Sequence, residues 1–200
     1  MTTTLQEDLL TASRDVLDAF IADKQQMEQI QLAADVMVKC LQNGGKIIAC
    51  GNGGSMSDAI HFCAELTGKF KTWRQALPAL AICDVAHITA VANDHDFDAV
   101  FERYIDAFGK EYDVLLAIST SGNSPNIINA IQEANRKRME VILLTGSTGG
   151  KMKEMMFPES YLSVDDFIHV PSTDTRLIQE VHIKVLHVLV MMIEKQMGLA

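Results

Sequence analysis

The fold of this chain is decided by residues 46–55, KIIACGNGGS, in which a short apolar run passes directly into a glycine-rich turn. The run is apolar at nearly every position instead of alternating, which is typical of a parallel strand covered by helices on both faces. Glycine tolerates positive φ and close backbone approach, so the turn predicts converging N–H groups that can bind an anion. Ser55 is predicted to be the N-cap of a following helix.

Runs of the same strand type recur along the chain, and helical segments separate them. The other predicted strands are Ala79–Cys83, Val114–Ser119, Val141–Thr145 and Asp166–Val170. Helices are predicted at 5–22, 26–42, 56–67, 97–108, 124–138 and Thr175–Lys195. This alternation predicts an α/β fold, a doubly wound parallel sheet of about five strands flanked by helices, with N-terminal helices and a long C-terminal helix. We expect a single domain over 1–200, with a helical segment to about residue 43 before the sheet.

A second loop with binding character, Ser119–Ser124, follows the strand predicted at 114–119. Four of its six residues carry a hydroxyl, and the sequence is STSGNS. Ligands bind beyond the carboxyl ends of parallel strands, so this loop and Gly51–Ser55 together predict a phosphosugar site. Either loop alone would be read as an ordinary strand-to-helix turn. Neither fits G-x-G-x-x-G or G-x-x-x-x-G-K-[ST], which disfavours a dinucleotide or a nucleoside triphosphate.

Composition narrows the choice of partners and compartment. The chain has 200 residues, 48% hydrophobic content and a net charge of -9, which argues against nucleic acid or an anionic membrane as a partner. No signal peptide opens the sequence, and the longest apolar run, Val188–Ile193, is too short to span a bilayer. We expect a soluble, cytoplasmic protein with reduced, buried thiols at Cys40, Cys50, Cys63 and Cys83.

Two helices bring polar side chains that could act on a ligand. His61 and Glu65 are four residues apart on the helix after the first loop and therefore share a face. Gln179 and His187 lie on the final helix about 80° apart in projection, so they can converge on one site at different heights. Taken singly, His61 also fits a core histidine and Glu65 a solvated carboxylate. Spacing alone does not favour His187 over His182.

These motifs, in this order, closely resemble the phosphoheptose isomerase family of the sugar isomerase (SIS) fold. The resemblance extends over nearly the whole chain. It rests on the segments Gly51–Ser55, His61–Glu65, Ala92–Asp94, Ser119–Ser124 and Gln179–His187.

The resemblance implies conversion of sedoheptulose 7-phosphate to D-glycero-D-manno-heptose 7-phosphate, the first step toward ADP-heptose for the lipopolysaccharide core. It also implies a homotetramer with active sites between subunits. One zinc ion per subunit would be bound by His61, Glu65, Gln179 and His187. Substrate contacts would be made by Asn52, Gly53, Gly54, Ser55, Glu65, Asn93, Asp94, Ser119, Thr120, Ser121, Ser124 and Gln179.

Ketose–aldose isomerisation through an enediol needs a carbon base and a group that manages oxygen protons. Glu65 and His187 are predicted to be this acid/base pair, with Glu65 as the carbon base. The phosphate would lie on the Ser119–Ser124 loop. Three features depart from the family: Lys69, where arginine is usual; the stretch 152–163, which is expected to be a surface connection; and Arg176-Leu177, which carry no predicted function.

Two other functions compete with this interpretation. One SIS relative binds the replication initiator DnaA and lacks both the catalytic carboxylate and the last histidine. Glu65 and His187 are present here, which favours an enzyme. The other rival is an isomerase of pentose 5-phosphates, a class that usually carries an extra regulatory module for which 200 residues leave no room.

Overall fold

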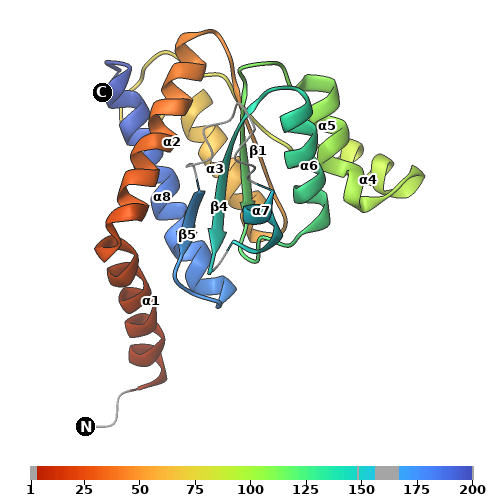
Figure 1. Ribbon diagram of the computed structural model, residues 1–200. Coiled ribbons are helices and arrows are strands. Elements are labelled where there is room, and N and C mark those ends of the chain that lie inside the picture. Colours follow the sequence, from red (N-terminus) through yellow and green to blue (C-terminus); the bar gives the residue numbers. More distant parts are fainter. Residues whose placement is uncertain (1–3, 148, 156–166, 200) are drawn as a thin grey trace.

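A computed structural model describes residues 4–147, 149–155 and 167–199 of the chain (Figure 1). Its centre is a five-stranded sheet in the order β2-β1-β3-β4-β5, with every neighbouring pair parallel. The predicted parallel α/β sheet is therefore confirmed. The strands are β1 (Ile47–Gly51), β2 (Ala79–Ala81), β3 (Val114–Ser119), β4 (Glu140–Gly146) and β5 (Phe167–Val170).

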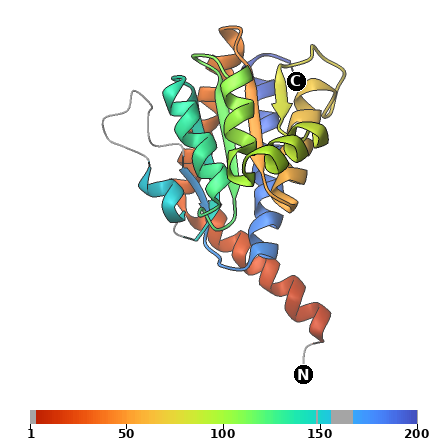
Figure 2. The same ribbon diagram turned by 90° about the vertical axis from the view of Figure 1, so that its right-hand side faces the viewer.

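Helices cover both faces of the sheet, as doubly wound folds require (Figure 2). One face packs against α2 (Lys24–Gln42), α3 (Gly54–Thr67) and α8 (Thr175–Gln196), and the end of α1 (Leu5–Ala22) joins this layer through Phe20. The other face packs against α5 (Val100–Phe108), α6 (Pro125–Arg136) and Met152 of the short α7 (Gly150–Glu154). The beginning of α1 projects away from the body, and so does α4 (Val85–Asp94) on the opposite side (Figure 1).

The strands are buried because both faces are covered. Every residue of β1 and β3 is buried, which explains their continuous apolar sequences. The edge strand β5 is protected in a different way. Its backbone N–H groups at Phe167 and His169 donate to the side-chain oxygens of two buried glutamines of α2, Gln29 at 3.0 Å and Gln26 at 2.8 Å.

Several local predictions were wrong at the ends of elements. The helix predicted at 56–67 begins at Gly54 with Gly53 as its N-cap, so Ser55 lies inside the first turn and is buried. The positive φ of Gly53, 55°, turns the chain into the helix early and takes the place of a side-chain cap. The Ser55 hydroxyl therefore does not cap the helix, and Ser55 contributes only its backbone to the first turn.

Three further differences concern α4, the beginning of the helix predicted at 97–108, and residue 152. The helix α4 was not predicted, and the helix predicted at 97–108 is a 3₁₀ turn, Phe97–Ala99, followed by α5. The first part of 152–163 is not a surface connection, because Met152 belongs to α7 and is fully buried. Residues 156–166, including Asp166 of the predicted last strand, lie outside the described residues.

The strand order places the two predicted loops at one crevice. The chain leaves β1 for β2 on one side of it and returns to β3 on the other side, so β1 and β3 form the topological switch point. Gly51 pairs with Ile118, and Ser119 pairs with Thr145, so the carboxyl ends of β1, β3 and β4 are level. The loops after β1 and β3 therefore open from the same edge.

The described part of the chain contains no helix that is both long and apolar enough to cross a membrane. Cys40, Cys50 and Cys63 are buried as expected, while Cys83 is half-buried. Burial raises the pKa of both Cys50 and Cys63 to about 12, so these thiols stay protonated and unreactive at neutral pH.

Candidate active site

The two loops at the carboxyl edge are joined by a pair of amides. Asn52, directly after β1, and Asn126, in the first turn of α6, exchange two hydrogen bonds of 2.9 Å. Asn126 is buried, so neither amide can easily turn away to water. This pair fixes the first loop against the helix that follows the second loop. Sequence analysis missed Asn126, whose only signal was its position directly after Ser124 and Pro125.

The second loop holds its hydroxyls in a fixed arrangement. Ser119 Oγ accepts from the backbone N–H of Gly122 at 3.2 Å and lies 3.3 Å from Ser124 Oγ. Ser121 Oγ accepts from the N–H of Asn123 at 3.2 Å. Ser124 is the N-cap of α6 but makes no side-chain capping bond, which leaves the helix N-terminus open to an anion. Hydroxyls and N–H groups of this kind are suited to phosphate oxygens.

The third loop, residues 149–152, is the N-cap and first turn of α7; it was not predicted, and it supports the second loop. The N–H of Met152 donates to Gly122 O at 2.9 Å, and the N–H of Lys151 donates to Asn123 Oδ1 at 3.1 Å. Gly122 has φ 65°, and a Cβ on it would come within 1.9 Å of Gly149 O, so only glycine fits. At the start of α8, Thr175 Oγ1 lies 3.5 Å from Thr120 Oγ1 and adds a hydroxyl that was also not predicted.

The predicted acid/base residues converge from α3 and α8. Glu65 Oε1 lies 3.1 Å from His61 Nε2 and 3.5 Å from His187 Nε2. The two imidazole rings meet edge to face with centroids 5.2 Å apart. The second carboxylate oxygen, Glu65 Oε2, is buried and has no hydrogen-bond partner among the described residues. We call His61, Glu65 and His187 the carboxylate–histidine cluster.

The structure resolves the choice between the two histidines of α8. His182 is fully buried, and its Nε2 makes a 3.0 Å hydrogen bond with the backbone oxygen of Thr145. Burial lowers the pKa of His182 to about 4, so it stays neutral in the core. His187 is 38% exposed and faces Glu65. His182 therefore has a structural position, and His187 is the histidine available to a ligand.

The carboxylate–histidine cluster fits a divalent metal. Its three ligand atoms all lie within 4.8 Å of one another. Two imidazole nitrogens and one carboxylate oxygen are ordinary zinc ligands, and catalytic zinc sites commonly use three protein ligands and keep one position open. The buried, unpartnered Glu65 Oε2 is a further oxygen that a cation would satisfy.

Gln179 occupies a different position in the protomer. Its carboxamide lies against the start of α3, where a Cβ on Gly54 would come within 2.5 Å of Gln179 Nε2. The eight residues from Gln179 to His187 correspond to about 12 Å along α8. Gln179 therefore lies beside the first loop, whereas the carboxylate–histidine cluster lies further along the same pair of helices.

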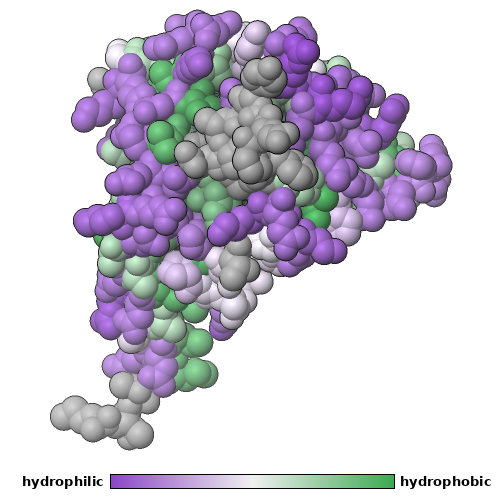
Figure 3. All heavy atoms as spheres, viewed as in Figure 1, coloured by the Kyte–Doolittle hydropathy of each residue, from purple (hydrophilic) through white to green (hydrophobic). Residues whose placement is uncertain are grey.

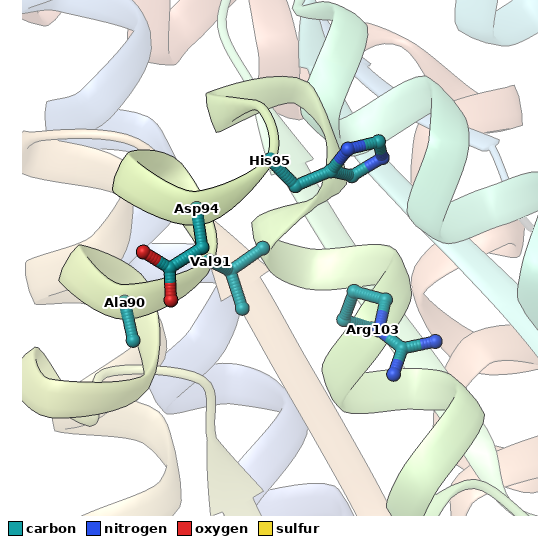
Figure 4. Close-up of a pocket in the computed structure, with 5 residues that line it drawn as sticks. All are labelled: Ala90, Val91, Asp94, His95 and Arg103. Atoms are coloured by element: carbon teal, nitrogen blue, oxygen red, sulfur yellow. The ribbon is translucent and has the colours of Figure 1, made fainter.

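The other predicted site residues are also divided in space. Glu65 lies about 16 Å along α3 from Gly54, toward the opposite edge of the sheet. Asn93 and Asp94 are exposed at the end of the projecting α4, where Asn93 Nδ2 donates to Asp94 Oδ1 at 2.7 Å. Asp94 lines a surface depression of about 380 Å³ with His95 and Arg103 (Figure 4). A single chain thus presents three separate groups of predicted residues.

One carboxyl near the carboxylate–histidine cluster was missed. Asp58 lies one turn before His61 on α3, and its Oδ2 is buried with no hydrogen-bond partner among the residues that the structure describes. Burial raises the pKa of Asp58 to about 6, and the charge of His61 opposes this shift. The Asp58 carboxyl therefore changes its charge at a higher pH than an ordinary aspartate does.

Comparison with known proteins gives a consistent family. A sequence model of the SIS domain matches residues 10–146. The phosphoheptose isomerase of Proteus mirabilis is 50% identical over 189 residues, which cover 94% of each chain. Among solved structures, phosphoheptose isomerase GmhA from Neisseria gonorrhoeae is 42% identical with a TM-score of 0.84, covering 96% of this chain and all of that one. A phosphoheptose isomerase from Francisella tularensis is 38% identical with a TM-score of 0.88, covering 97% of this chain and all of that one.

Proposed function

This chain belongs to the phosphoheptose isomerases of the SIS domain family, and from that premise we propose that it converts sedoheptulose 7-phosphate to D-glycero-D-manno-heptose 7-phosphate. The reaction would be the first step toward ADP-heptose for the lipopolysaccharide core. The observation that carries the proposal is the carboxylate of Glu65 placed between His61 and His187. A carboxylate and a histidine in contact are the groups that an enediol mechanism needs.

Glu65 is the carbon base in this mechanism. It removes a proton from C1 of the ketose while His187 gives a proton to the C2 carbonyl oxygen, which produces the enediol. His187 then takes the proton from the C1 hydroxyl, and Glu65 returns its proton to C2, which yields the aldose. The two side chains end in their starting protonation states, so the cycle is balanced.

The carboxylate–histidine cluster supports zinc as the cofactor, one ion per subunit. His61, Glu65 and His187 would hold it, with His187 bound through one ring nitrogen so that the other nitrogen carries the proton, and Gln179 is the fourth proposed ligand. A zinc ion bound there would supply Lewis-acid polarisation of the substrate carbonyl. Glu65 Oε1 faces the two histidines, and Glu65 Oε2 has no hydrogen-bond partner in the described chain, so the carboxylate has an oxygen left to bind a cation.

The loops of the carboxyl edge would bind the phosphate. The hydroxyls of Ser119, Thr120, Ser121 and Ser124 and the open N-terminus of α6 supply donors without a basic patch, which suits a chain of net charge -9. Asn52, Gly53, Gly54 and Ser55 line the other side of the same crevice. Phosphate held there would fix the register of the reacting carbons.

We propose that the complete site forms between protomers of a homotetramer. A seven-carbon sugar phosphate extends at most about 10 Å from C2 to phosphorus, over seven bonds of about 1.5 Å each. This is shorter than the distance of about 16 Å along α3 from Gly54 to Glu65. The loops of one protomer would therefore work with the carboxylate–histidine cluster of another. The same arrangement would bring Gln179 and the exposed pair Asn93 and Asp94 to a shared site.

Exposed apolar surface supports such an assembly. Leu5 and Leu10 on the projecting part of α1 are 71% and 72% exposed. Apolar side chains also show on the surface along this helix in Figure 3. A groove of about 400 Å³ between α1, α2 and α8 is lined mostly by apolar side chains, among them Leu17, Ile21 and Val188. Surfaces of this kind commonly mark protein–protein interfaces.

The competing functions have less support. A DnaA-binding SIS protein does not need the carboxylate–histidine cluster, which is intact here. An isomerase of pentose 5-phosphates would use the same site and would differ only in its substrate. We propose that the enzyme acts in the cytoplasm, consistent with its buried thiols.

Incubating the purified protein with sedoheptulose 7-phosphate, and with pentose and hexose phosphates in parallel, tests the proposal when aldose formation is followed by NMR. Turnover confined to the heptose is expected, and turnover confined to a pentose would overturn it.

A further inference from the structure

A buried ion pair that is outside the proposed catalytic and binding residues joins α8 to the segment after α3. Arg74 Nε donates to Glu194 Oε1 at 2.7 Å, and the two side chains are only 3% and 2% exposed. Taking both charges out of water is costly, and it is compensated only where hydrogen bonds satisfy the remaining donors and acceptors. The partners of Arg74 therefore indicate what the pair does.

The other N–H groups of Arg74 bind the end of α3. Its Nη2 donates to the backbone oxygen of Glu65 at 2.8 Å, and its Nη1 donates to those of Leu66 at 2.6 Å and Gln75 at 3.0 Å. The carbonyls of Glu65 and Leu66 belong to the last turn of α3 and have no intrahelical partner. A cationic guanidinium is also favoured at the negative end of a helix. Arg74 thus caps α3 at Glu65 itself.

The Arg74–Glu194 pair is also connected to His187, through α8 and through Phe70. Glu194 follows His187 by seven residues, about two turns, so both lie on one face of α8. Phe70, on the same connecting segment as Arg74, stacks on His187 with ring centroids 5.6 Å apart and an interplanar angle of 30°. Arg74 therefore contacts the helix that carries Glu65, is paired with the helix that carries His187, and anchors the segment that carries Phe70.

We infer that Arg74, held by Glu194, is a positioning residue that sets the distance between Glu65 and His187. The inference rests on the proposed function only in taking those two side chains as the acid/base pair. Groups that orient ligands or reacting side chains typically contribute 10- to 100-fold to activity or metal affinity. Lysine cannot replace Arg74, because its single ammonium cannot bond Glu194 and the α3 carbonyls in the fixed geometry of a guanidinium.

Two variants separate positioning from mere stabilisation. Arg74→Lys keeps the charge opposite Glu194 and should remain folded. The double variant Arg74→Met/Glu194→Leu replaces the ion pair by apolar side chains, a change that is often neutral for stability. The matched control is Arg136→Met, which removes an arginine bonded through Nε and Nη2 to the buried Glu133 on α6, at the other face of the sheet.

The test compares kcat and KM for sedoheptulose 7-phosphate, the Tm, and the NMR shifts of the His187 ring protons in the purified proteins. We expect kcat to fall 10- to 100-fold in the folded Arg74 variants, KM to change less than threefold, and the His187 ring protons to move as Phe70 leaves its stack. Arg136→Met should match the parent protein in kcat, KM and the His187 ring shifts, whatever it does to the Tm. A folded Arg74→Lys protein with kcat within threefold of the parent would overturn the inference.

The NMR measurement keeps the result independent of the proposed reaction. If the parent protein fails to turn over sedoheptulose 7-phosphate, the proposed function fails, and the His187 ring protons still decide the positioning role. A shift in Arg74→Lys then supports it. Identical shifts in the parent and in Arg74→Lys refute it.

Discussion

Glu65 Oε1 lies 3.5 Å from His187 Nε2, although the two residues are far apart in the sequence. Glu65 belongs to α3, and His187 belongs to α8, which follows the last four strands. The parallel packing of these helices brings the two side chains together, and His61 completes the cluster from the same face of α3. The loops that would bind phosphate lie at the other end of α3. This division between the acting side chains and the binding loops underlies the predictions that follow.

Metal removal should abolish activity reversibly. We expect about one zinc ion per subunit by elemental analysis, loss of both zinc and turnover after chelation, and recovery on adding zinc back. His61→Ala should weaken zinc binding by at least 10-fold, because it removes one of three clustered ligands. His95→Ala, at the C-cap of α4 and outside the carboxylate–histidine cluster, is the control for zinc content. Full turnover in zinc-free protein would contradict the cofactor assignment.

The amide pair of Asn52 and Asn126 should govern substrate affinity more than the chemical step. In the parent protein, Asn126 Nδ2 donates a hydrogen bond to Asn52 Oδ1. Asn126→Asp replaces this amide nitrogen with a carboxylate oxygen, which cannot donate, so the first loop loses its fixed position. We expect KM for the sugar phosphate to rise about 10-fold with a smaller change in kcat, since lost orientation of this kind is costly. Gln132→Glu, exposed on the same helix, makes the equivalent charge change and should leave KM unaltered.

Gly122 should tolerate no side chain, because of both its positive φ and the close approach of Gly149. Comparison with Gly44 separates these two causes. Gly122 and Gly44 both have positive φ, but an added Cβ meets Gly149 O at 1.9 Å only at Gly122 and nothing within 4 Å at Gly44. Gly44→Ala should lower the free energy of unfolding by about 1 kcal/mol, the conformational cost alone. Gly122→Ala should cost more and weaken phosphate binding. Equal Tm values for the two variants would show that the third loop does not brace the second.

His182 should make stability depend on pH in a defined direction. Its folded pKa of about 4 lies below the ordinary value of 6.5, so between these values the unfolded state binds more protons. The contribution of neutral His182 to the free energy of unfolding is therefore fully present above about pH 6.5. It falls by up to about 3 kcal/mol as the pH drops toward 4.

Asp58 acts in the opposite direction, because burial raises its pKa to about 6 and its folded form binds the extra proton. The parent protein shows the sum of both effects. Urea unfolding of the parent and of His182→Gln between pH 4 and 7 isolates the histidine by difference. The difference in unfolding free energy should grow with pH, and a constant difference would show that His182 is not titrating in this range.

The sequence predicts the sheet well because each of its features has a local cause. Continuous apolar runs at β1 and β3 exist because both faces of these strands are buried, and glycine at 53 and 122 supplies the positive φ of the loops. The i, i+4 spacing of His61 and Glu65 predicts their shared face, which the 3.1 Å contact confirms. Helix ends were less predictable, because Gly53 starts α3 through its backbone and leaves Ser55 buried inside it.

Long-range contacts could not be predicted from local patterns. Nothing in the sequence near Arg74 indicates that its guanidinium meets Glu194 and the carbonyl of Glu65. Likewise, the rotation of α8 about its axis, which buries His182 and presents His187, depends on packing against α3 and β4 and not on spacing along the helix. These tertiary contacts are where the arrangement of the candidate site is decided.

The central claim, that Glu65 removes the proton from C1 and protonates C2, is tested most directly in D₂O. Conversion of sedoheptulose 7-phosphate by the parent protein should give an aldose with deuterium at C2, because the proton held on the carboxylate exchanges with solvent before it is returned. Glu65→Gln should remain folded and lose at least about 100-fold in kcat, the typical contribution of general base catalysis. Glu28→Gln, exposed on α2, should behave as the parent does. A folded Glu65→Gln protein that forms C2-deuterated aldose at the parent rate would contradict the claim.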